Sequence, residues 1–143
     1  MTTSALEQQV GGGHYKGKKI QPVEFAMANG WDFCASSALK YILRHQDKAG
    51  ELDLRKAIHF GQLREELLKP IHKRGIPVID VEDLISENGI ECQETRYALR
   101  ALSRWVYSTP GSARQRELGF LGDFTLGVEM MIDAYYPKPK KVR

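Results

Sequence analysis

Two apolar helical repeats separated by a very short turn constrain the fold of this chain most. From Asp32 to about Lys48, and again from about Leu52 to Lys69, apolar residues recur three and four positions apart, the spacing of an amphipathic helix. Only a few residues around Gly50 separate the two repeats. Helices joined this tightly lie antiparallel, so the sequence predicts a helical hairpin.

Further helices are expected on both sides of this hairpin. Pro22 suits a first helical turn, and Asp80 is placed to cap a helix that follows it. The expected helices run over about 22–29, 80–88, 94–108 and 117–135. The β-branched stretch 71–79 is interpreted as an extended linker, since a lone strand would have no partner. We expect a mainly α fold, an antiparallel helical hairpin packed with additional C-terminal helices, with little or no β structure.

Length and charge indicate one domain with tails. The chain has 143 residues, of which 42% are hydrophobic, enough for one core. We expect a flexible Gly/Lys arm over 1–19, a single helical domain over 20–136 and a basic tail over 137–143. The tail supplies four of the positive charges behind a net charge of +3, so the rest of the chain is not basic. Any anion-binding site must therefore be local.

The sequence also favours a location in the cytoplasm and argues against a permanent metal site. No apolar run approaches the ~20 residues that span a bilayer, and the first residues do not resemble a signal peptide. Cys34 and Cys92 stand alone, which suits reduced thiols. The histidines show no spacing typical of metal ligands. They are His14, His45, His59 and His72.

A line of cations is the sharpest chemical pattern. Lys40, Arg44 and Lys48 follow one another at intervals of four, which places them along one helix face and suits a row of phosphates. Across the turn, Asp53 and Lys56 share a face of the partner helix. The alternative interpretation is an ordinary solvated face, with Asp53 favoured by the helix dipole.

The N-terminal arm nearly matches a phosphate-binding loop. Gly12 is followed at the right interval by Gly17 and Lys18, but Lys19 stands where the metal-binding Ser or Thr belongs, and no strand precedes the loop. We therefore reject a true P-loop. Glycine-rich backbone can still approach phosphate, so the arm is expected to close over a bound nucleotide as a flap.

A second basic line lies further along the chain. Arg96, Arg100 and Arg104 recur at intervals of four, beside Tyr97 and Trp105. Guanidinium groups next to aromatic rings suit a base and its phosphate. The alternative is that the two aromatic residues pack into the core while the arginines face water.

The first half of the chain resembles a small bacteriophage family described as nucleotide kinase-like. The resemblance spans about residues 14–68. It rests on an ordered set of short motifs, namely His14-Tyr15, Ile20-Gln-Pro-Val-Glu-Phe25, Phe33, Leu39-Lys-Tyr41, Arg44, Lys48, Gly50, Asp53-Leu54, Lys56-Ala57 and His59-Phe60. Ser36-Ser37 replaces the Gly-Asn that the family usually carries before its Lys-Tyr pair.

The resemblance implies a phage protein that acts on nucleotides in the host cell cytoplasm, with at least one type of member that phosphorylates deoxynucleoside monophosphates without a P-loop. For a nucleotide kinase we expect Lys40, Arg44 and Lys48 to neutralise the phosphates and Tyr41 or Trp105 to stack on the base. Asp53 would orient the acceptor or a magnesium ion, and the candidate catalytic residues are Asp53, Lys40 and Arg44. The nucleotide-binding residues would be His14, Tyr15, Ser37, Lys40, Tyr41, Arg44, Lys48 and Lys56. No cofactor is expected to be bound permanently, although Mg²⁺ can accompany the nucleotide.

Two other functions stay open from the sequence. One is a non-catalytic nucleotide binder that sequesters a host nucleotide signal. The other is a nucleic-acid-binding accessory protein that uses the Arg96 line and the basic tail. In each case we expect a homo-oligomer, because the glycine-interrupted apolar stretch from Phe120 to Ile132 offers more apolar surface than one domain can hide. Its glycines also predict close helix packing or a break.

Overall fold

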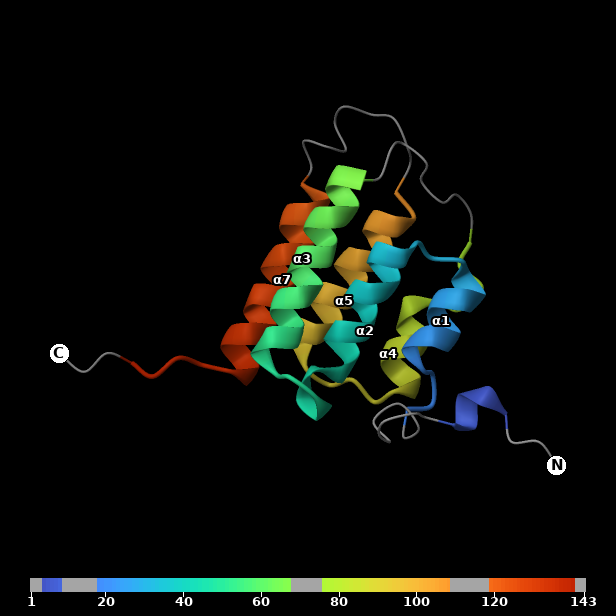
Figure 1. Cartoon of the computed structure of the whole chain (residues 1–143), viewed down its shortest axis with the longest axis horizontal. Helices are drawn as coiled ribbons and strands as arrows, with labels where there is room; N and C mark the ends of the chain where they lie inside the picture. The colour runs from blue at the N-terminus through green and yellow to red at the C-terminus, as the bar shows by residue number, and fades with distance from the viewer. Residues whose placement is uncertain (1–3, 9–17, 68–75, 109–118, 141–143) are drawn as a thin grey trace.

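The computed structural model describes residues 4–8, 18–67, 76–108 and 119–140, and these are mainly helical and contain no strand. Figure 1 shows the helices, which are α1 (Pro22–Asn29), α2 (Phe33–Arg44), α3 (Glu51–Leu67), α4 (Val81–Glu87), α5 (Gln93–Val106) and α7 (Phe120–Tyr135). Short 3₁₀ helices η1 (Ala5–Glu7) and η2 (His45–Asp47) complete the set for the described residues. The predicted mainly α fold is confirmed.

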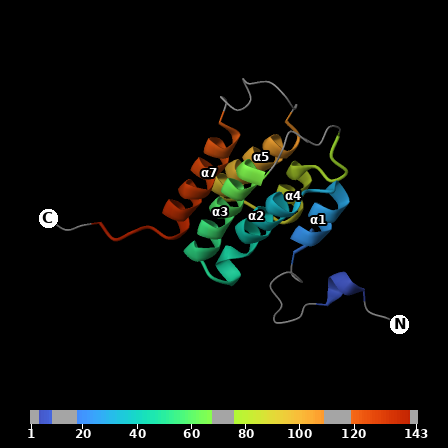
Figure 2. The same ribbon diagram turned by 45° about the horizontal axis from the view of Figure 1, so that its top comes forward.

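The predicted hairpin forms the centre of the molecule. α2 and α3 run antiparallel, joined by η2 and the turn at Gly50 (Figures 1 and 2). α5 and α7 form a second antiparallel pair, with α7 packed against α3 and α5 against α2. α1 lies beside α2, and α4 lies beside α5.

Local signals in the sequence set most helix ends. The Asp32 carboxylate accepts a hydrogen bond from the Ala35 amide at 2.9 Å and caps α2. Asp80 caps α4 in the same way, through the Glu82 amide at 2.8 Å. Gly30 ends α1 with a φ of 60°, in the left-handed region that favours glycine.

The predicted end of the second helix is wrong by one turn. α2 stops at Arg44, and the chain continues as the tighter η2 before the turn at Gly50. The backbone amide of Gly50 bonds to the His45 carbonyl at 2.9 Å, which turns the chain toward α3. Lys48 therefore lies beyond α2, where the backbone no longer follows α-helical spacing.

One core joins the helices. Each of the α-helices contributes a large, fully buried apolar side chain, namely Phe25 from α1, Leu39 from α2, Leu54 from α3, Leu84 from α4, Leu102 from α5 and Phe124 from α7. The close packing predicted for the last helix is confirmed at Gly127. A Cβ there would lie 2.8 Å from the Tyr97 ring and 2.9 Å from the Ala98 Cα of α5.

Other predictions fall partly or wholly outside the described residues. Those on the arm concern residues 9–17, including His14 and Tyr15, and part of the predicted linker falls within 68–75. Across the described ranges, no helix combines the length and apolar character that a membrane crossing requires. The homo-oligomer stays a prediction; the apolar side chains that α7 exposes are Leu126 and Met130.

Candidate functional site

Three cations gather around one aromatic ring where α2 meets α3. The Lys40 Nζ lies 4.6 Å from the centre of the Tyr41 ring, the Arg44 guanidinium carbon lies 4.7 Å from it, and the Lys56 Nζ lies 5.5 Å from it. We call these four residues the Tyr41 cluster. A tyrosine face attracts cations through its quadrupole, so the ring offsets part of the repulsion among the three charges.

Asp53 holds the arginine of this cluster in place. Its carboxylate accepts two hydrogen bonds from the Arg44 guanidinium, at 3.2 and 3.3 Å, and a third from the Ala49 backbone amide at 3.2 Å. Asp53 is fully buried, whereas the Arg44 side chain keeps 21% of its surface exposed. The carboxylate predicted to orient an acceptor or a magnesium ion thus lies beneath Arg44, where it positions the guanidinium.

The cluster carries an excess of positive charge. Asp53 is the counter-ion of Arg44, but no carboxylate in the described ranges pairs with Lys40 or Lys56. Both lysines are partly exposed at the surface. Bringing like charges this close costs free energy unless an anion joins them, so the cluster suits a group with more than one negative charge.

An apolar cavity adjoins the cluster. Phe60 stacks on the Tyr41 ring at 5.7 Å between ring centres, and Phe33 meets Phe60 edge-on at 6.0 Å. Phe33 also lines a cavity of about 440 Å³ between α1 and α2, together with Lys40. Its other lining residues are Pro22, Val23, Ala26, Met27, Trp31, Ser36 and Ser37. The size is within the range of small-molecule pockets, which is roughly 300–1,000 Å³.

The structure brings together most, but not all, of the described residues that the sequence singled out. Lys40, Tyr41, Arg44 and Lys56 share the cluster, with Asp53 beneath it and the buried Ser37 in the adjoining cavity. Lys48 is exposed past the end of α2, so the predicted three-cation line stops at Arg44. For His14 and Tyr15 the structure gives no placement, because they lie outside the described residues.

Two arginines of the second basic line, Arg96 and Arg100, form hydrogen bonds with neighbouring parts of the chain. The Arg100 guanidinium makes a two-pronged ion pair with Glu82 of α4, at 2.6 and 2.9 Å. Arg96 donates to the Ile90 carbonyl at 2.6 Å, which fixes the turn that enters α5. Trp105 is buried, and the Arg64 guanidinium covers its ring at 4.6 Å. Two of the three arginines therefore hold α4 and its following turn against α5.

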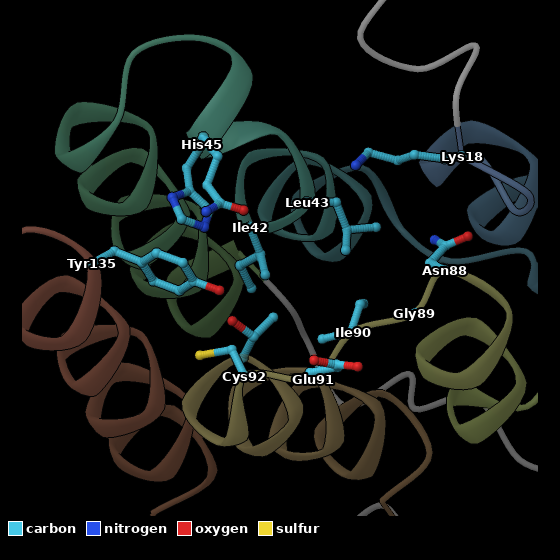
Figure 3. Close-up of a pocket in the computed structure, with 12 residues that line it drawn as sticks. Lys18, Ile42, Leu43, His45, Asn88, Gly89, Ile90, Glu91, Cys92 and Tyr135 are labelled. Atoms are coloured by element: carbon cyan, nitrogen blue, oxygen red, sulfur yellow. The ribbon is translucent and has the colours of Figure 1, made fainter.

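A polar pocket of about 270 Å³ lies at the C-terminal end of α2 (Figure 3). Its walls come from segments far apart in the sequence, including Lys18, His45 and Gln46, the turn from Asn88 to Cys92, Thr95 and Tyr135. His45 is buried and its Nδ1 lies 2.7 Å from the Tyr136 hydroxyl. In Figure 3 the Tyr135 hydroxyl points into the pocket between Ile42 and Cys92.

Burial shifts the pKa of two groups on the pocket wall, His45 and Tyr135, in the direction that favours their neutral forms. Burial lowers the pKa of His45, and the charge of Lys18 adds to that effect, while Asp53 and Asp47 oppose it. Burial raises the pKa of Tyr135, and a hydrogen bond with Cys92 raises it further. The wall therefore presents neutral donors and acceptors, and charge enters only with Lys18 and Glu91.

The sequence contained little sign of this pocket. It identified His45 and Cys92 only as residues without a metal-binding grouping, and Lys18 only as part of the rejected P-loop. Four segments that are far apart in the sequence build the site, so no local spacing could reveal it.

The family match found for this chain lies in its first half. The family described as a protein of unknown function (DUF3310) matches residues 10–62. That segment contains α1, α2 and most of α3, and therefore the whole Tyr41 cluster. No curated protein matches the chain. No solved structure matches it either. The matching family names no activity, so the function must be argued from the site.

Proposed function

We propose that this protein binds a nucleotide, with its phosphates on the Tyr41 cluster and its base in the adjoining apolar cavity. The observation that carries the proposal is the meeting of Lys40, Arg44 and Lys56 around one ring, where Asp53 is the one carboxylate that pairs with them among the ion pairs of the described residues. Phosphate groups supply the missing negative charge. Charge-assisted hydrogen bonds from lysine and arginine are the strongest that such a site can offer them.

The shape of the neighbouring cavity supports a nucleotide over free phosphate. Lys40 and Phe33 belong to both the cavity and the surroundings of the cluster, so one ligand can reach both. The cavity walls are mostly apolar, with aromatic rings at Trp31 and Phe33, which suit the flat face of a base. Few free polar groups line it, so we expect weak discrimination among bases.

We further propose that the bound nucleotide is a substrate for phosphoryl transfer. The resemblance of residues 14–68 to the nucleotide kinase-like phage family supports this step. Such transfer depends mainly on positioning and on neutralising the charge that spreads over the phosphoryl oxygens, and a fixed guanidinium with two lysines can supply both. In this reaction a triphosphate would give its γ-phosphoryl group to a deoxynucleoside monophosphate, leaving two diphosphates.

Charge removal from the cluster tests the binding proposal. Lys40→Gln with Lys56→Gln should weaken binding of deoxynucleoside monophosphates and of ATP at least tenfold, about 1.4 kcal/mol, measured by calorimetry. Arg55→Gln is the matched control, because it removes one charge from the same helix at an exposed position beside Lys56. Equal affinity in the double variant and the control would refute the site.

Product formation tests the second step separately. The protein is incubated with ATP, Mg²⁺ and each deoxynucleoside monophosphate, and diphosphates are separated by chromatography. Turnover that falls with Arg44→Gln supports the kinase. Binding without any turnover would instead establish a non-catalytic nucleotide binder, the alternative function that the sequence left open.

A further inference from the structure

We propose that Tyr136, at the end of α7, is a positioning residue for the Tyr41 cluster. It holds the turn through which Asp53 orients the Arg44 guanidinium. The contacts themselves need no ligand, whereas their effect on a nucleotide rests on the function proposed above. Tyr136 lies outside residues 10–62, the segment that matches the family. The proposal therefore gives the second half of the chain a part in the site.

Two contacts join Tyr136 to the turn between α2 and α3. Its hydroxyl forms a hydrogen bond of 2.7 Å with the Nδ1 of His45, although the two residues are 91 positions apart. Its ring covers Gly50, where a Cβ would lie 3.2 Å from the nearest ring carbon. Gly50 has a φ of 59°, which glycine adopts without strain, and its bare Cα lets the ring approach. Tyr136 therefore contacts the turn at both ends, just after α2 and just before α3.

Backbone hydrogen bonds carry these contacts to the cluster. The Gly50 amide bonds to the His45 carbonyl at 2.9 Å, which ties the two ends of the turn together. The preceding amide, from Ala49, donates to the Asp53 carboxylate at 3.2 Å. Asp53 in turn accepts two hydrogen bonds from the Arg44 guanidinium, at 3.2 and 3.3 Å. An unbroken series of contacts thus leads from the end of α7 to the arginine of the cluster.

The charge of Asp53 reaches both partners of the hydrogen bond at the end of α7. Burial raises the pKa of the Tyr136 phenol, and the Asp53 charge raises it further. Burial lowers the pKa of His45, and the same charge opposes that effect. The three side chains therefore lie close together, behind the guanidinium that Asp53 holds.

The turn depends on such contacts for its rigidity. Residues 46–49 are exposed, so the turn has no buried side chain of its own between His45 and Gly50. α2 and α3 pack through core residues further along their length, so loss of the Tyr136 contacts should loosen the turn and leave the hairpin paired. A functional side chain needs to be held within about 0.5 Å of its productive position, and Arg44 would lose that support.

Hydrogen exchange without ligand tests the positioning directly. Tyr136→Leu removes both contacts and Tyr136→Phe removes the hydroxyl alone. Tyr135→Phe is the matched control, because it removes a hydroxyl that points into the polar pocket (Figure 3). In NMR spectra of the full chain, Tyr136→Leu should speed exchange of the Ala49 and Gly50 amides and of the Arg44 Nε proton about tenfold, relative to amides in the middle of α5. Tyr136→Phe should speed it about threefold, and Tyr135→Phe should leave it unchanged.

A merely structural role of Tyr136 gives a different pattern, because lost stability raises exchange throughout the bundle. An equal increase in α5 and in the turn, or no increase in the turn, overturns the proposal. Should the leucine variant fail to fold, Tyr136→Phe decides by the same comparison.

Nucleotide titration tests the consequence for the site. Calorimetry with a deoxynucleoside monophosphate and with ATP, at a temperature where every variant is folded, should show affinity about tenfold weaker in Tyr136→Leu and about threefold weaker in Tyr136→Phe. Tyr135→Phe should bind as the parent does. Faster exchange in the turn with unchanged affinity overturns the proposal. A parent that binds no nucleotide refutes the proposed function instead, and the exchange rates still decide whether Tyr136 positions Arg44.

Discussion

At the scale of single residues, the buried pair between Asp53 and Arg44 does most to shape the Tyr41 cluster. Arg44 reaches the cluster from the last turn of α2, and Asp53 reaches it from the first turn of α3. The third hydrogen bond of Asp53, from the Ala49 amide, ties the carboxylate to the turn between the helices. One acid thus bonds both to the turn of the hairpin and to the Arg44 guanidinium, whose orientation it sets.

Asp53→Asn should lower both stability and nucleotide affinity. The amide cannot balance Arg44, and breaking a buried ion pair costs about 3–5 kcal/mol, so the free energy of unfolding in urea should fall by roughly 3 kcal/mol. Asp133→Asn removes an equal charge from an exposed position on α7 and should change it little. Equal stability of the two variants would show that the buried pair contributes nothing.

At the scale of helices, glycines set how closely α7 approaches its neighbours. Gly127 lies against Ala98 of α5, and Gly61 of α3 lies against Phe124, where a Cβ would be 2.8 Å from the ring. Neither position has room for a methyl group unless a neighbour moves. Gly122, one and a half turns before Gly127, has nothing within 4 Å of where its Cβ would lie.

Alanine substitution should separate these two glycines of α7. Gly127→Ala should destabilise the fold by about 1–3 kcal/mol, because the added methyl group meets Tyr97 and the backbone of Ala98. Gly122→Ala should stabilise it by roughly 0.5–1 kcal/mol, because alanine favours the helix and meets no obstacle. Urea unfolding of both variants measures the difference, and the same sign for both would contradict the packing described.

At the scale of the whole molecule, the C-terminal end of α7 meets the turn between α2 and α3 at His45. Its ring contacts Tyr135 edge-on at 4.6 Å between ring centres, and its Nδ1 lies 2.7 Å from the Tyr136 hydroxyl. The ring of Tyr136 also covers Gly50, where a Cβ would lie 3.2 Å away. The C-terminal end of α7 is thereby fixed to the turn of the hairpin by residues ninety positions apart.

This contact makes stability depend on pH near neutrality. Burial lowers the pKa of His45 below its usual 6.5, so the unfolded chain binds a proton more readily than the folded one. The stabilisation is complete above pH 6.5 and is lost as the pH falls toward the lowered pKa of the folded state. The free energy of unfolding in urea should therefore be smaller at about pH 5.5 than at about pH 7.5, where ordinary carboxylates stay ionised.

Two histidine variants test whether His45 causes this pH dependence of stability. His45→Gln should flatten the pH dependence over that range, whereas His59→Gln, at an exposed position on α3, should leave it as in the parent. A dependence that survives in His45→Gln would show that another group titrates.

The sequence by itself determined the helices and the hairpin. Apolar spacing, the caps Asp32 and Asp80 and the glycine at position 30 are local signals, and each acts through the backbone within one turn. The same spacing placed Lys40 and Arg44 on one face of α2. The lysine at position 48 did not follow, because the tight turn at Gly50 ended the helix one turn early.

Only the tertiary structure decided what surrounds these residues. That Lys56 meets Tyr41 depends on the packing of α2 against α3, and that Asp53 lies buried depends on the turn closing over it. The polar pocket depends on still more distant contacts, since Lys18, Thr95 and Tyr135 come together only when the helices pack. Local patterns in the sequence carry backbone preferences over a turn or two, whereas burial and unpaired charge are properties of the assembled chain.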